Sequence, residues 1–221
     1  MRTARWLVPL FLFVALLMFL RAPYLIDAAP EEKQLGIVQK IFYFHVASAI
    51  TAMLSAILSG AASGVYLGRR RPLADHIGLA AAELVVVFGA IVLVTGPLWA
   101  RKSWGVWWVW EPRLIITLIM WMLFVSYLLL RRFGGPGSDV LASALSLFGA
   151  VLVPFVYWST YVWRTMHPPP TVIPTLQPEM MWPFLWSVLA FLVFYVALMF
   201  VRVRLEQSRA ALEQVYLALE D

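Results

Sequence analysis

Four tryptophans crowd into seven positions, residues 104–110, which read Trp-Gly-Val-Trp-Trp-Val-Trp between two long apolar runs. An ordinary interfacial belt places one or two Trp or Tyr at the end of a membrane span, so anchoring alone does not explain this density. Grouped indoles offer a large flat apolar surface with N–H groups at its rim. We interpret the segment as a platform for a planar aromatic ligand, formed by Trp104, Gly105, Trp107, Trp108 and Trp110.

Charged residues flank this platform on both sides. Arg101 and Lys102 precede it, Glu111 ends it, and Arg113 follows. The three cations suit carboxylates at the edge of a planar ligand, through charge-assisted hydrogen bonds. Pro112 favours the first position of a helix, which makes Glu111 the expected N-cap of the next span and a partner for an arginine. The candidate binding motif therefore extends over residues 101–113.

Two of the three histidines fall on the same predicted side of the membrane as the tryptophans. His45 continues an apolar helical face, and the helix that carries it could begin near Pro30. His167 precedes three prolines, which favour a stiff, extended support. Either histidine alone would be read as a solvated or hydrogen-bonded residue. Together beside an indole platform they predict a metal site, because imidazole is a good axial ligand for haem iron.

Composition places the chain among integral membrane proteins. Of its 221 residues, 62% are hydrophobic and 13% are charged, which is far too apolar for a soluble domain. The absence of cysteine excludes disulfides and thiolate chemistry within the chain. The basic residues lie in short loops between apolar runs, so the net charge of +5 indicates membrane topology rather than binding to nucleic acid.

The apolar runs predict an all-α membrane protein, a bundle of six transmembrane helices forming a single domain over residues 1–221. A span needs about 20 residues, and the chain offers six, at roughly 6–26, 41–67, 77–98, 112–130, 140–162 and 182–203. Ten of the 17 Lys and Arg residues, including residues 69–71 and 131–132, fall on the side of both termini, which predicts cytoplasmic termini. The first span is interpreted as a signal anchor, with a cleaved signal peptide as the alternative.

Two further features concern the opposite end of the bundle. Glu83 lies inside the third span, where we interpret it as a buried structural carboxyl, hydrogen-bonded by Ser126 or Tyr127; the alternative is a role in transport. The segment 202–221 is predicted to be a cytoplasmic amphipathic tail that forms a short surface helix.

The tryptophan run and the segments around His45 and His167 resemble the haem-handling protein C (CcmC) family of cytochrome c maturation. The resemblance rests on Ile-Phe-Tyr-Phe-His45-Val, on the Trp-Gly-x-Trp-Trp-x-Trp-acid-x-Arg-Leu run and on Arg164-x-x-His167-Pro, and it covers essentially the whole chain. The family motif commonly has Asp where this chain has Glu111. The resemblance implies that haem b is held at the outer face of the bacterial inner membrane, with His45 and His167 as axial ligands.

The resemblance also implies partners. These are a membrane-anchored haem chaperone that receives the haem, the ATPase and membrane subunits of an ABC transporter, a small single-span accessory protein, and membrane lipid. No catalytic nucleophile is evident, which favours a haem-transfer protein over an enzyme. The alternatives that the residues leave open are a membrane b-type haem electron carrier and a small-molecule transporter that uses Glu83.

Overall fold

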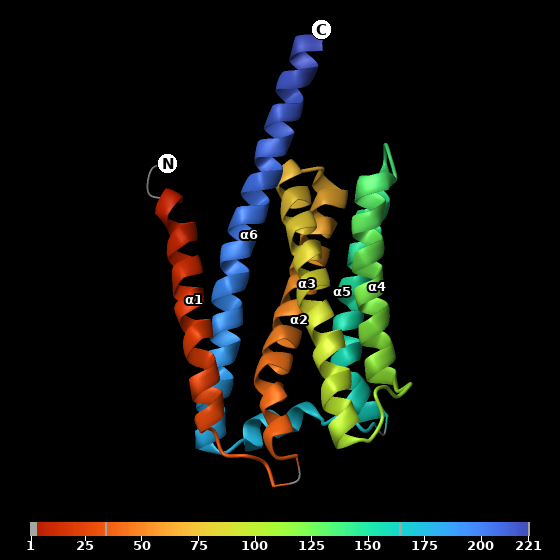
Figure 1. The fold of residues 1–221 in the computed structure, drawn as a ribbon. Coiled ribbons are helices and arrows are strands. Elements are labelled where there is room, and N and C mark those ends of the chain that lie inside the picture. The colour runs from red at the N-terminus through yellow and green to blue at the C-terminus, as the bar shows by residue number, and fades with distance from the viewer. Residues whose placement is uncertain (1–3, 34, 164, 221) are drawn as a thin grey trace.

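Six long helices lie side by side in the computed structural model, which describes residues 4–33, 35–163 and 165–220 (Figure 1). Within those residues, each of the six is long and apolar enough to cross a membrane, so the predicted six-span all-α architecture is confirmed. The helices are α1 (Ala4–Ala28), α2 (Ile41–Arg69), α3 (Pro72–Ser103), α4 (Pro112–Phe133), α5 (Ser138–Val162) and α6 (Pro178–Glu220). Two short 3-10 helices accompany them, η1 (Ile37–Lys40) and η2 (Pro170–Thr175).

The start of the second span differs from the prediction. We expected its helix to begin near Pro30, but α2 begins at Ile41, directly after η1. The Gly36 N–H donates to the Glu32 carbonyl at 2.8 Å, and the Gln39 N–H donates to the Gly36 carbonyl at 3.2 Å. Gly36 adopts φ +56° and ψ −141°, outside the helical region, so no continuous helix runs from Pro30 into α2, and His45 lies in the second turn of α2.

Both termini lie at one end of the bundle, and the α1–α2, α3–α4 and α5–α6 connections lie at the other (Figure 1). The α3–α4 connection carries the tryptophan motif, and the α5–α6 connection carries His167. The fold therefore gathers the predicted site residues at one end.

Small residues allow the central helix α2 to pack closely against α3, α5 and α6. The Ser55 hydroxyl donates to the Ala81 carbonyl at 2.8 Å, and the Ser59 hydroxyl donates to the Gly78 carbonyl at 2.9 Å. Gly60 faces α5 so closely that a Cβ atom at this position would lie 2.3 Å from the Cβ atom of Ala150. Such close backbone approach and interhelical hydrogen bonds are typical of helix packing in membranes, where apolar burial supplies little attraction.

The opposite end of the bundle holds a charged network. Glu83 accepts hydrogen bonds from Arg202 of α6, one of them at 2.6 Å, and Arg202 also donates to Glu206 at 2.8 Å. The expected partners Ser126 and Tyr127 were wrong, because α6 places a guanidinium there that satisfies both carboxylate oxygens. The paired carboxylate supports the interpretation of Glu83 as a structural residue.

The tail after Arg202 is no separate surface helix, which corrects the prediction. Helix α6 continues without a break to Glu220 and projects beyond the bundle (Figure 1). Residues 211–220 are exposed along the whole projection. Residues 202–220 thus continue helix α6, and Asp221 lies outside the described residues.

Candidate functional site

His45 projects from α2 toward α3. Its Nδ1 atom lies 2.8 Å from the Thr95 hydroxyl oxygen, and Thr95 in turn donates to the Ile91 carbonyl at 2.7 Å. The ring packs closely on α3, since a Cβ atom on Gly96 would lie 3.4 Å from His45 Cε1. The contact with Thr95 uses Nδ1 and leaves Nε2 for another partner.

His167 lies in the connection between α5 and α6, where it is half-buried. Its Nδ1–H donates to the Pro168 carbonyl at 2.8 Å, because a carbonyl oxygen can only accept. Burial lowers the pKa of the His167 imidazole to about 3, and the positive charge of Arg113 acts in the same direction. His167 is therefore neutral at physiological pH, with a lone pair on Nε2, which is the form of imidazole that binds metals.

Arg113 links the two histidines electrostatically. The positive charge of Arg113 lowers the pKa of the His167 imidazole, and His45 has a smaller effect in the same direction. The three residues come from the second turn of α2, the first turn of α4 and the α5–α6 connection. The structure thus places His45, Arg113 and His167 at one end of the bundle, and their role as one binding site stays a prediction.

Glu111 connects the tryptophan motif to the His167 segment. As predicted, Glu111 is the N-cap residue of α4, but within the described residues its side chain caps no backbone N–H of that helix. Its Oε2 atom instead accepts a hydrogen bond from the Met166 N–H at 2.8 Å. Glu111 and Arg113, both among the described residues, form no ion pair, and the predicted pairing of Glu111 with an arginine stays a prediction. The longer Glu side chain reaches across to the neighbouring connection instead.

The tryptophans form two edge-to-face pairs. The ring centroids of Trp99 and Trp104 lie 5.3 Å apart, and those of Trp108 and Trp110 lie 6.0 Å apart. Trp104 and Trp108 are half-buried, whereas Trp107 is 58% exposed and Trp110 is 76% exposed. The half-buried rings anchor the motif, and the exposed rings of Trp107 and Trp110 present aromatic surface to a ligand or to lipid.

The predicted cations Arg101, Lys102 and Arg113 differ in the contacts that they make. Arg101 donates to the Gly105 carbonyl, and its guanidinium lies over the Trp107 ring at 6.0 Å from the centroid. Gly105 adopts φ +78°, a left-handed conformation that favours glycine and turns the chain back toward Arg101. Lys102 is exposed at the rim. Arg101 therefore stabilises the motif, while Arg113 keeps donor capacity for a ligand.

Unsatisfied polar atoms concentrate at this motif. In the part of the chain that the structure describes, seven buried side-chain N or O atoms have no hydrogen-bond partner. Four of them belong to residues 103–113: Ser103 Oγ, Trp108 Nε1, Glu111 Oε1 and Arg113 Nη1. Buried polar groups in proteins are nearly always hydrogen-bonded, so such a cluster is typical of a site that holds a polar-edged ligand or water.

Sequence reasoning missed three participants in this site. Thr95 contacts His45, Trp99 packs on Trp104, and the Met166 backbone binds Glu111. Thr95 and Met166 lie 50 and 55 positions from their partners, so no local pattern marks them. Arg164, which belongs to the histidine motif, lies outside the described residues.

Comparison with known proteins identifies the family. A family model described as heme exporter protein C matches residues 1–217. The chain belongs to the heme exporter protein C family. Similar proteins, each named heme exporter protein C, occur in Bradyrhizobium diazoefficiens (34% identity, covering 82% of this chain and 71% of that protein), Escherichia coli K12 (32%, 80% and 73%) and Rhodobacter capsulatus (30%, 84% and 81%). Membership of the heme exporter protein C family connects the chain to haem transport and cytochrome c biogenesis.

Proposed function

We propose that this protein binds haem b at the extracytoplasmic face of the bacterial inner membrane and presents it to a membrane-anchored haem chaperone. The observation that carries the proposal is the convergence of His45 and His167 beside Arg113. Each imidazole uses Nδ1 for a hydrogen bond within the protein, and among the described residues no hydrogen bond uses its Nε2 atom. Two such imidazoles are suited to the two axial positions of haem iron.

The tryptophan motif supplies the remaining contacts in this proposal. The exposed faces of Trp107 and Trp110 suit stacking on a porphyrin. Arg113 has a buried Nη1 atom that finds no acceptor among the described residues, and a propionate carboxylate would satisfy it. Arg101 and Lys102 add positive charge at the rim, which favours the same acidic edge.

The two ligands differ in how firmly they are held, which suits delivery. His45 lies within a helix packed in the bundle, whereas His167 lies in a connection held by the Glu111–Met166 hydrogen bond. Displacing His167 would open one coordination position without disturbing the packing of the helices. We therefore infer that the chaperone's own ligand replaces His167. The ABC transporter subunits and a single-span accessory protein remain the partners expected to release the loaded chaperone.

The two alternatives have less support. A small-molecule transporter was suggested by Glu83, but Arg202 pairs with this carboxylate at 2.6 Å. An electron carrier would normally bury haem between spans, whereas the motif proposed here lies at the end of the bundle and exposes Trp107 and Trp110.

Co-purification from membranes with a tagged chaperone tests the proposal. We expect a chaperone able to bind haem to recover this protein, and a chaperone without its haem-binding histidine to recover much less. Trp107→Ala should reduce recovery, whereas Trp182→Ala should not, although Trp182 is equally exposed at 57% and lies at the same end of the bundle. Equal recovery with and without haem would contradict haem-dependent presentation.

A further inference from the structure

The Thr95 hydroxyl has only one hydrogen, and its two neighbours determine which of them accepts it. Thr95 Oγ1 lies 2.7 Å from the Ile91 carbonyl, one helical turn earlier in α3, and 2.8 Å from His45 Nδ1. The Ile91 carbonyl can only accept, so the hydroxyl donates to it. The hydroxyl oxygen can then only accept from His45. Both contacts are satisfied together when Nδ1 carries the imidazole proton.

We infer that Thr95 is a positioning residue that keeps the His45 proton on Nδ1 and thereby leaves the Nε2 lone pair for iron. This inference rests on the proposed function, since it assigns Thr95 its role through His45 as a haem ligand. Histidines that bind metals usually donate their other N–H to an oxygen, which fixes the tautomer and the ring orientation. Nothing in the local sequence marks Thr95, because it meets His45 only through the packing of α3 on α2.

The surroundings hold the ring in this orientation. Gly96, the next residue of α3, lies beside the imidazole, since a Cβ atom there would be in van der Waals contact with His45 Cε1 at 3.4 Å. Rotation of the ring about its bond to Cβ would take Nδ1 away from Thr95. The hydrogen bond and the close wall of α3 therefore restrict the imidazole together.

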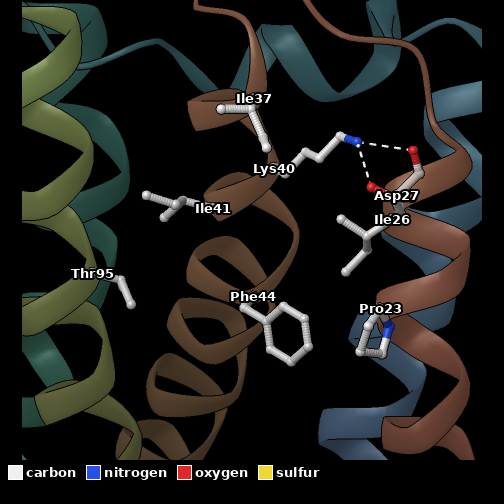
Figure 2. Close-up of a pocket in the computed structure, with 8 residues that line it drawn as sticks. All are labelled: Pro23, Ile26, Asp27, Ile37, Lys40, Ile41, Phe44 and Thr95. Atoms are coloured by element: carbon white, nitrogen blue, oxygen red, sulfur yellow. Dashed lines mark hydrogen bonds and ion pairs between the residues drawn. The ribbon is translucent and has the colours of Figure 1, made fainter.

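Thr95 also borders a cavity of about 400 Å³ between α1, α2 and α3 (Figure 2). Apolar side chains line most of it, and Lys40, paired with Asp27 at 3.3 Å, lies at its rim. Because Thr95 borders this cavity, a substitution that tests the hydroxyl must leave the size of the cavity unchanged. Thr95→Ala would enlarge it, whereas Thr95→Val keeps the side-chain volume and removes only the hydroxyl.

Haem titration of purified protein in detergent, followed by absorbance, tests the inference. We expect Thr95→Val to raise the haem dissociation constant about 10- to 100-fold, the usual cost of losing such a partner of a metal ligand. Thr95→Ser retains the hydroxyl and should restore wild-type affinity. Thr51→Val is the matched control, because the buried Thr51 hydroxyl donates only to Ala47 of its own helix, at 2.9 Å. Wild-type affinity in Thr95→Val, with affinity lost in His45→Ala, would overturn the inference and leave the proposed function standing.

A second measurement needs no haem. Nitrogen-15 spectra of histidine-labelled, haem-free protein report the tautomer, and His45→Ala identifies the His45 resonances among three histidines. We expect the Nδ1–H tautomer in the wild type and in Thr95→Ser, and a mixture in Thr95→Val. If no variant binds haem, the proposed function fails, and these spectra still decide the role of Thr95. An unchanged tautomer in Thr95→Val would overturn the inference.

Discussion

Replacing Glu111 should release the segment that carries His167. Glu111 is only 9% exposed, and its carboxylate accepts a hydrogen bond at 2.8 Å from the N–H of Met166, the residue before His167. A hydrogen bond to a charged group contributes about 1.5–3 kcal/mol, which corresponds to roughly 10- to 150-fold in an equilibrium constant. Glu111→Ala should therefore shift the segment toward its released state by this factor. Glu111→Gln retains an acceptor oxygen without the charge and should have a smaller effect.

Hydrogen exchange measured by mass spectrometry tests this directly in the haem-free protein. Because Pro168, Pro169 and Pro170 have no amide hydrogen, exchange within residues 165–170 comes only from Thr165, Met166 and His167. We expect the Met166 amide to exchange about 10- to 150-fold faster in Glu111→Ala, in proportion to the lost hydrogen bond.

The haem dissociation constant should rise with the release of this segment, by at most the same factor, because only the docked segment presents His167. Glu179→Ala is the matched control, since Glu179 is an exposed acidic residue in the first turn of α6 at the same end of the bundle. Wild-type exchange of residues 165–167 in Glu111→Ala would refute the reasoning, because the hydrogen bond would then not hold the segment.

Three other predictions concern packing, ligand charge and topology. Gly60→Ala should destabilise the protein by about 1–3 kcal/mol through collision with α5, whereas Gly68→Ala, with open space around its Cβ, should not; thermal unfolding in detergent distinguishes them. Arg113→Gln should weaken haem binding about 10-fold or more in the absorbance titration, by removing the charge that pairs with a propionate, and unchanged affinity would exclude that contact. A cysteine introduced at Thr175 should react with an impermeant thiol reagent added from outside, whereas one introduced at Ser138 should react only after the membrane is permeabilised. The reverse pattern would place the tryptophan motif in the cytoplasm.

Local patterns were sufficient to predict the six spans, and they singled out a candidate site whose residues lie at one end of the bundle. Apolar runs of about 20 residues define membrane helices whatever their neighbours are, and six helices necessarily return both termini to one end. The tryptophan run and the two histidines are unusual in their own segments, so their residue types alone indicated a ligand site. The extents of the helices were harder to predict, as the 3-10 turn before Ile41 and the long continuation of α6 show.

Contacts between distant segments could not be predicted. Glu83 and Arg202 are 119 positions apart, and Glu111 and Met166 are 55 apart, so these pairs depend on how the helices pack. The same holds for Thr95, whose importance follows only from the ring nitrogen that it contacts. Sequence patterns thus indicated the candidate ligands, while the residues that contact them from distant segments required the three-dimensional arrangement.

The most direct test of the central claim is the visible absorption spectrum of the protein purified from haem-replete cells, oxidised and reduced. Two imidazoles from His45 and His167 predict a low-spin, six-coordinate haem spectrum. His45→Ala and His167→Ala should each lose this spectrum while still inserting into the membrane, because neither side chain satisfies a helix backbone. Colourless protein that leaves added haem with the spectrum of free haem, or a wild-type spectrum in either variant, would contradict the account.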